Sequence, residues 1–248
     1  MTPATLTARQ NAIFDMLEAD RRLAGRLYRD GVPSPEVYLA QAFKVIFVFR
    51  EPNLGGQHRR HDMRLEVRDP HFRPLISGER IERTSHCWWN AKAGMFAHAV
   101  AAAIDGEPSR SALRRFRPGD WHHDVVNRFG YLQIKKTGGA GQSVAGEIRS
   151  HAAIWAHALR GQLDVYAPDL VIGCGTGGHG PAQLLAEHVL TGGTREETRR
   201  TTAVWWRFDV GRRPKAMLQA WHPSIRKERS EVYRDLYASV REVMAHLT

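Results

Sequence analysis

The sequence predicts an α/β protein in which helices cover both faces of a mainly parallel, four-stranded central sheet. Apolar runs indicate strands at residues 44–50, 129–136, 169–174 and 215–222, and a further extended run at 203–210 adds a strand. Most of the segments between these predicted strands carry apolar residues at helical spacing, which predicts helices there. Buried strands that alternate with helices are typical of a parallel sheet covered on both faces, which gives three layers, α/β/α.

Length and composition favour one globular domain over the whole chain, 1–248. The chain has 248 residues, of which 42% are hydrophobic and 25% charged, and no apolar stretch approaches the 18 residues of a membrane span. The first twenty residues lack the charged-then-apolar layout of a signal peptide. We therefore expect a cytoplasmic protein with no membrane contact, and a monomer.

Helical spacing predicts the elements around the strands. A first helix is expected from Thr7 to about Arg29, ending at Asp30 and Gly31, within an N-terminal helical extension of residues 1–43. The segment 54–86 is too long for an ordinary connection and is interpreted as a basic insertion. Further helices are expected at 90–104, 146–163 with Ser143 as its cap, 181–190 and 230–247; the buried side of the second of these carries Ile148, Ile154, Trp155 and Leu159.

A glycine loop follows the strand at 169–174. Gly173, Gly175 and Gly178 satisfy the G-x-G-x-x-G pattern of nucleotide-binding loops, which an S-adenosylmethionine-dependent methyltransferase would also show. Such a loop belongs after the first strand of its fold, whereas this one follows the third, and Glu196 and Glu197 fall in a segment that reads as a polar loop. Close packing of the loop against the next helix is the favoured interpretation, with no cofactor; a methyltransferase remains the less favoured alternative.

The charge balance favours a polyanionic partner. Lys and Arg number 36 against 26 acidic residues, which gives a formal net charge of +10. A basic excess of this kind attracts phosphates, so nucleic acid is the expected partner. The two cysteines are far apart in sequence, and arginines interrupt the histidines of 58–62, so neither a metal site nor an iron–sulfur cluster is expected.

Polar motifs follow the first and last of the four predicted parallel strands. Glu51-Pro52 comes after the first strand, and His222-Pro223-Ser224 comes after the last. Ligands of such folds lie beyond the carboxyl ends of the strands. The residues to examine are therefore those directly after each strand, among them Glu51 and His222.

In motif order and in strand–helix alternation, the chain from Lys44 onward resembles the uracil-DNA glycosylase superfamily. The resemblance implies a strand order of 2-1-3-4 for the parallel strands. It also implies a protein of DNA repair by base excision: one that binds DNA, single- or double-stranded, flips a base and hydrolyses its N-glycosidic bond without a cofactor. Glu51 and His222 are then the predicted catalytic pair. Cleavage of the bond builds positive charge on the sugar, which a carboxylate stabilises, and negative charge on the departing base, which a neutral histidine stabilises by donating a hydrogen bond. An alternative is a protein of the same fold that binds nucleic acid or a nucleotide without cleaving it.

The resemblance also implies residues that bind the flipped base and the DNA backbone. Gln133 corresponds to the amide that reads the base edge, and Asn53 shapes the pocket after Glu51-Pro52. The aromatic side chain that stacks on the base is sought among Trp88, Trp89 and Phe72, with Trp89 preferred. The residues expected on the phosphates, with Arg226 as a wedge into the duplex, are Lys135, Lys136, Ser143, Ser224 and Arg226.

Several departures from the family pattern indicate a divergent branch whose base need not be uracil. Gln133 stands where the family usually has the shorter asparagine, and Asn53 stands where it usually has glycine or a bulky aromatic. The insertion 54–86 is longer and more basic than the family segment. The four cysteines of the cluster-binding branches are missing from this sequence, which has two.

Overall fold

The computed structural model describes most of the chain. The described residues are 1–52, 61–68, 92–117, 123–139, 143–201, 203–209, 214–223 and 225–247. Within these ranges, none of the helices combines the length and the apolar character that crossing a membrane requires.

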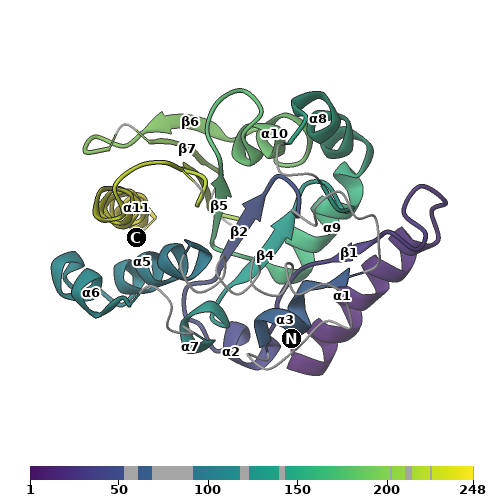
Figure 1. Cartoon of the computed structure of the whole chain (residues 1–248), viewed down its shortest axis with the longest axis horizontal. Coiled ribbons are helices and arrows are strands. Elements are labelled where there is room, and N and C mark those ends of the chain that lie inside the picture. The colour runs from purple at the N-terminus through teal and green to yellow at the C-terminus, as the bar shows by residue number, and fades with distance from the viewer. Residues whose placement is uncertain are drawn as a thin grey trace.

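A six-stranded sheet crosses the molecule and confirms the predicted α/β class (Figure 1). Its strand order is β4-β2-β5-β8-β7-β6. The strands are β2 (Val45–Phe49), β4 (Gly130–Gln133), β5 (Leu170–Cys174), β6 (Thr194–Glu197), β7 (Val204–Arg207) and β8 (Ala216–Ala220). Strands β4, β2, β5 and β8 run parallel, and β7 and β6 are added antiparallel. Counted among the parallel strands alone, this order is 2-1-3-4.

The sheet contains one strand that the sequence did not predict, because the segment that forms β6 was expected to be a loop. Its sequence, TREE, is entirely polar, and its residues are exposed or half-buried. It pairs with β7 through Thr194 opposite Arg207 and Glu197 opposite Val204. A short, charged strand at a sheet edge limits pairing with other chains, and such a strand carries no apolar pattern from which to predict it.

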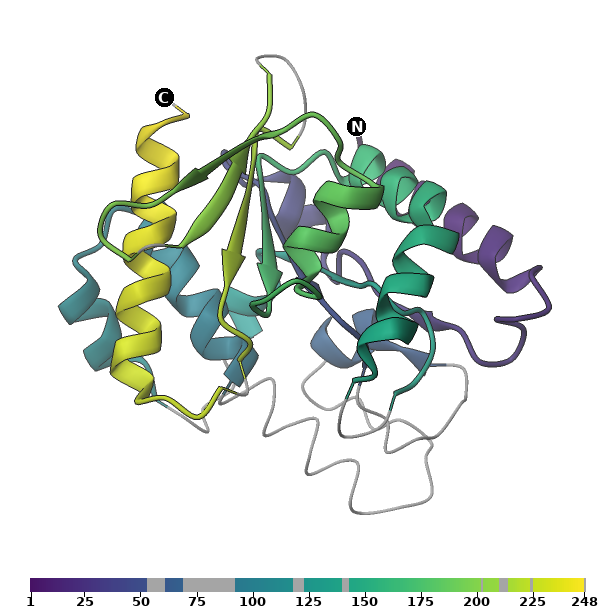
Figure 2. The same cartoon turned by 90° about the horizontal axis from the view of Figure 1, so that it is seen from above.

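Helices cover the sheet on both faces, as Figure 2 shows. Helices α5 (Gly94–Ile104) and α11 (Arg229–Ala245) pack on one face, and α8 (Ala145–Ile154), α9 (Ala156–Tyr166) and α10 (Pro181–His188) pack on the other. The shorter helices are α2 (Pro35–Leu39), α3 (Met63–Arg68), α6 (Ser109–Arg115) and α7 (His123–Val126).

Strand β2 shows why the parallel strands read as continuous apolar runs. Val45, Phe47 and Phe49 belong to the core on the α5–α11 face, whereas Ile46 and Val48 belong to the core on the α8–α10 face. All five residues are at most 2% exposed. A strand buried on both faces needs no polar side, so its pattern has no alternation.

The predicted N-terminal helix from Thr7 to Arg29 is wrong in its second half. Helix α1 spans Pro3–Glu18, and the chain then turns into β1 (Tyr28–Arg29), which pairs in parallel with β3 (His61–Asp62). The apolar residues that suggested a longer helix are buried by tertiary contacts instead: Leu23 and Leu27 share a small core with Phe14, Leu17 and Trp155. Gly31 then forms an antiparallel bridge with Tyr131, so this segment runs along the free edge of β4.

The predicted helix at 146–163 is divided at Trp155 into α8 and α9. Trp155 leaves the helical conformation with φ −100° and ψ 16° and is buried. Ile148 and Leu159 are buried as predicted, but Ile154 is 43% exposed because it lies at this corner. The predicted cap is also wrong: Val144 occupies the N-cap position of α8, and no side chain caps it.

Candidate functional site

The carboxyl ends of the four parallel strands bring the predicted catalytic residues to one level of the sheet. Val48 of β2 pairs with Gly173 of β5, which pairs with Gln219 of β8. Glu51 and His222 each stand three residues beyond this rung, since 51 − 48 and 222 − 219 are both three. One strand lies between β2 and β8, so two strand spacings, roughly 10 Å, separate these two strands. We call Lys135, Glu51, Thr176 and His222, which follow β4, β2, β5 and β8, the carboxyl-edge row.

The Glu51 carboxylate is buried and held from the β4 side. Its side chain is 4% exposed, and Oε2 lies 2.9 Å from Nζ of Lys135. The same ammonium lies 2.8 Å from Oε2 of Glu147, in the first turn of α8. Gly139 donates its N–H to the carbonyl of Pro52 at 2.8 Å, and a Cβ added at Gly139 would overlap the Glu51 carboxylate. The row thus contains a fixed carboxylate packed under the chain that follows β4.

Lys135 and Lys136 are engaged inside the protein rather than presented to phosphates. Burial opposes the charge of Lys135, but its hydrogen bonds with Glu147 and Glu51 outweigh burial and raise its pKa. Lys136 is 0% exposed, and its Nζ lies 2.6 Å from Oδ2 of Asp30. The predicted phosphate contact of Lys136 is therefore excluded in this structure, and Lys135 instead orients the Glu51 carboxylate.

Gln133, the last residue of β4, carries a buried side-chain oxygen that accepts no hydrogen bond in the described part of the chain. Its side chain is buried, with the residue 5% exposed, and its Oε1 finds no hydrogen-bond partner within the described ranges. Its backbone N–H donates to Oδ2 of Asp30 at 2.6 Å, which fixes the end of the strand. An unpaired buried amide oxygen costs about 1–3 kcal/mol, and such a cost is often found where a ligand completes the bond.

His222 is held neutral. Burial, together with the nearby positive charges of Arg50 and Lys92, lowers its pKa to about 4. At neutral pH the imidazole therefore carries a single proton, which leaves one N–H to donate. This is the protonation state that the sequence argument requires of a donor to a departing base.

The lowered pKa of His222 predicts a pH-dependent stability. The unfolded chain protonates His222 near pH 6.5 and the folded chain only near pH 4. The contribution of neutral His222 to folding is therefore fully present above pH 6.5 and is lost as the pH falls through about 4. We expect an NMR titration of its ring to give a midpoint near 4, and urea unfolding of H222Q to lose less stability than the unmodified chain between pH 6.5 and 4. A ring midpoint at 6 or above would contradict the half-buried environment beside Arg50 and Lys92.

Sequence reasoning missed Arg50 and His151. Arg50 lies directly before Glu51, donates to the carbonyl of Thr176 at 3.3 Å, and keeps its Nε buried without a partner in the described part of the chain. Burial lowers the pKa of His151 on α8, and Lys135 lowers it further. The place of Arg50 at a strand end was a usable signal. His151 stands four residues after Glu147, a spacing that puts both on one helix face.

The glycine loop after β5 packs as the sequence analysis favoured. A Cβ at Gly173 would overlap the backbone N of Ala182 in α10, so only glycine lets the helix approach the strand this closely. Gly175 has φ +138°, in the region that favours glycine. A Cβ added to it would contact the Arg50 guanidinium. The loop therefore seats α10 and Arg50 against the end of β5.

The remaining predicted residues lie at the ends of described segments or outside them. Asn53, Phe72, Trp88, Trp89 and Ser224, with most of the insertion 54–86, lie outside the described residues. Ser143 is half-buried and precedes α8, and Arg226 is exposed before α11. At the start of α11 the side chain of Glu228 accepts from the N–H of Glu231 at 3.0 Å, so the protein's own carboxylate takes up this backbone donor. The predicted phosphate contacts of Ser224 and Arg226 stay predictions.

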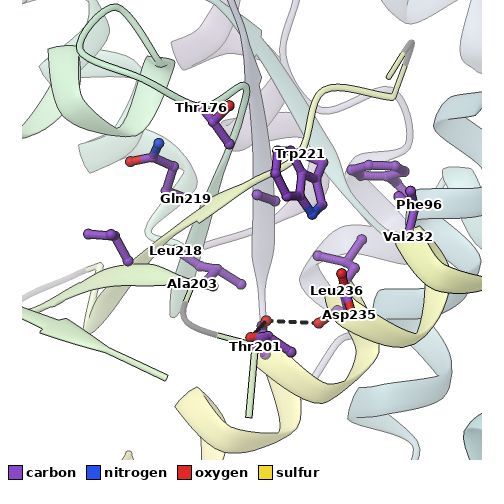
Figure 3. A pocket seen from close by; sticks show the side chains of 13 residues that line it. Phe96, Thr176, Thr201, Ala203, Leu218, Gln219, Trp221, Val232, Asp235 and Leu236 are labelled. Carbon is purple, nitrogen blue, oxygen red and sulfur yellow. Dashed lines mark hydrogen bonds between the residues drawn. The ribbon is translucent and has the colours of Figure 1, made fainter. Parts of the chain in front are cut away.

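A cavity of about 190 Å³ lies beside the carboxyl-edge row, between β8, the start of β7 and α11 (Figure 3). Neither Glu51 nor His222 lines it, but Thr176 of the row does. Most of its lining comes from the end of β8, the start of β7 and α11: Leu218 to Trp221, then Thr201, Ala203 and Val204, then Val232, Asp235, Leu236 and Ser239. Phe96 of α5 and Thr176 after β5 complete it.

Comparison of the chain with protein-family models, with curated proteins and with solved structures finds no match. The geometry of the site is therefore the ground for its interpretation.

Proposed function

We propose that the protein hydrolyses the N-glycosidic bond of a base in nucleic acid, with Glu51 and His222 as its catalytic residues. The observation that carries the proposal is the register of the sheet, which aligns a buried carboxylate and a neutral histidine at one edge, with one strand between them. The parallel strand order 2-1-3-4 and the helices on both faces support a glycosylase-like fold around this edge.

The chemistry assigned to the pair needs no group from outside the chain except water. Water attacks the anomeric carbon, a C–O bond forms, and the C–N bond to the base breaks with its electron pair leaving on the base. Glu51 stabilises the cationic sugar and orients the water, and neutral His222 donates its N–H to the base carbonyl as negative charge develops there. The proton lost by the water is taken up by the departing base.

Positive charge around the row supports a nucleic-acid substrate. Arg50 and Lys92 are close enough to His222 to lower its pKa, and the chain has a net charge of +10. A site with this surplus attracts the phosphates on either side of an extruded nucleotide. The unpaired Oε1 of Gln133 at the neighbouring strand end supports its role in reading a base edge.

A second function, binding without cleavage, is favoured by one observation. The Glu51 carboxylate is ion-paired with Lys135 and covered at Gly139, an arrangement that also suits a purely structural carboxylate. A protein of this kind would bind nucleic acid at the same edge and release no base.

An oligonucleotide panel separates the two functions. Single- and double-stranded oligonucleotides that carry uracil, hypoxanthine, xanthine or a mismatch are incubated with the protein, and abasic sites are scored by strand cleavage in alkali. Binding to the same oligonucleotides is measured in parallel by fluorescence anisotropy. The proposal expects abasic sites on at least one substrate. Binding across the panel with no abasic site would favour the non-catalytic protein.

Replacement of Gly139 by alanine tests the position of the carboxylate without changing its chemistry. The new methyl group would overlap the Glu51 carboxylate and displace it. Because misplacement of a reacting group by about 1 Å can cost on the order of 100-fold in rate, we expect a loss of this size in abasic-site formation. The matched control is G146A on α8, where an added Cβ meets nothing within 4 Å. Equal activity of G139A and G146A would argue against a catalytic Glu51.

A further inference from the structure

The cavity beside β8 combines apolar walls with several polar side chains. Leu218, Val232 and Leu236 are buried and form its apolar walls, and Phe96 and Trp221 supply aromatic surface. Within the described ranges, no hydrogen bond or ion pair engages the Asp235 carboxylate, and none engages the side chains of Thr176 and Gln219. An apolar pocket with a few convergent polar groups is the usual form of a small-molecule site.

The cavity arises because two paired strands separate. The ladder between β7 and β8 ends at Trp205 opposite Leu218. Beyond this rung Ala203 is hydrogen-bonded to Thr198 instead: its N–H donates to the Thr198 hydroxyl at 2.9 Å, and its carbonyl accepts from the N–H of Thr198 at 2.9 Å. Thr201 is tied to Ser239 of α11 by a hydroxyl contact of 2.6 Å (Figure 3). These bonds hold the wall open, so the cavity is part of the fold.

Its size restricts the ligand to one small ring system. An apolar cavity of about 150 Å³ in a protein admits benzene. The volume here is about 190 Å³, which leaves room for a ring with one or two substituents. Trp221 and Phe96 offer faces or edges for stacking on such a ring.

The Asp235 carboxylate on the α11 wall determines which substituent the bound ring carries. An ionised carboxylate accepts hydrogen bonds and donates none, and carboxylates recognise the amino groups of bases in this way. Lys227, whose positive charge interacts with Asp235, is ion-paired with Glu231 at 2.7 Å and lies 4.5 Å from the centre of the Trp221 ring. We propose that this cavity binds a free planar heteroaromatic ring that carries an amino group, with Asp235 accepting from that group and Trp221 packing on the ring.

This ligand is distinct from the extruded base of the proposed function. Glu51 and His222 do not line the cavity, and its contact with the carboxyl-edge row is through Thr176. Binding of the free ring therefore requires neither DNA nor glycosidic cleavage, and a failure of either proposal leaves the other standing.

Titration of the full chain with 2-aminopyridine, and with pyridine as the ring without the amino group, tests the proposal. The indole N–H resonance of Trp221, assigned by comparison with W221F, reports binding at this cavity, and calorimetry gives the affinity. We expect saturable binding of 2-aminopyridine and at least about 10-fold weaker binding of pyridine, the difference typical of a hydrogen bond to a charged group.

Three variants locate the site. D235N is expected to weaken 2-aminopyridine by about 10-fold or more while leaving pyridine unchanged. D164N, the same substitution at an exposed carboxylate of α9 on the other face of the sheet, is the matched control and should change neither affinity. A203L fills the cavity from its β7 side and should abolish both. Absence of a Trp221 shift with either compound, or equal affinities in D235N and D164N, would overturn the proposal.

Discussion

Replacement of Lys136 by alanine is expected to lower the free energy of unfolding by about 3–5 kcal/mol, the cost of leaving one partner of a buried ion pair uncompensated. Lys136 and Asp30 are both 0% exposed, and their charged atoms lie 2.6 Å apart. Burial lowers the pKa of Lys136, and the charge of Asp30 acts in the opposite direction. K136A would leave the Asp30 carboxylate in the interior without its cation.

The effect is large because the Asp30 carboxylate accepts hydrogen bonds from three groups, two at the end of β4 and one on α9. Its Oδ2 accepts from Lys136 and from the N–H of Gln133, and its Oδ1 accepts from Nε2 of Gln162 on α9 at 2.8 Å. Loss of the lysine therefore disturbs the edge of β4 and its contact with α9 together. A buried network of this kind is cooperative, so a single deletion exceeds the value of one exposed bond.

Urea unfolding of K136A, of D30N and of the double variant D30N/K136M measures this coupling. The double variant removes both charges and should recover much of the loss, since replacing a whole buried ion pair is often nearly neutral. The matched surface control is K227A, which removes the exposed Lys227–Glu231 pair and should change stability little. Equal stability of K136A and K227A would mean that the buried pair does not hold the β4 edge.

The two adjacent lysines illustrate what the sequence could predict and what it could not. Their place at the end of a predicted strand was predictable from the apolar run before them. Their roles were not, because side chains at successive positions diverge: Lys135 meets Glu51 and Glu147, and Lys136 meets Asp30, 106 residues earlier in the chain. The net positive charge favoured phosphates for both, and only tertiary structure reveals the carboxylates that engage them.

The helices also show which features could be predicted from the sequence and which could not. Apolar spacing predicted α5, α10 and α11 because each buries one face against the sheet. It failed for residues 19–29, where Leu23 and Leu27 are buried through turns, and at Trp155, where no glycine or proline marks the break between α8 and α9. The place of Glu51 and His222 at the ends of two strands followed from two apolar runs, and their catalytic role stays a prediction. The register that puts the two residues at one level needed the paired sheet.

Replacement of Glu51 by glutamine is expected to reduce abasic-site formation by about 10²- to 10⁴-fold, the range of a positioned acid or base. The amide keeps the shape of the side chain but not the charge that would stabilise the cationic sugar. Binding to the oligonucleotide, measured by anisotropy, should remain within a small factor, because the substitution removes no cation from the site. The measurement is single-turnover formation of alkali-labile sites on the best substrate of the panel.

Glu147 provides the matched control for this substitution. It is the other carboxylate on the Lys135 ammonium, at 2.8 Å against 2.9 Å for Glu51, but it projects from α8 with a side chain that is 54% exposed. E147Q and E51Q therefore remove the same charge from the same lysine, and only E51Q removes it from the carboxyl-edge row. A large loss confined to E51Q assigns the chemistry to the row. Equal losses in the two variants would show instead that the lysine's ion pairs matter and that Glu51 has no separate catalytic role.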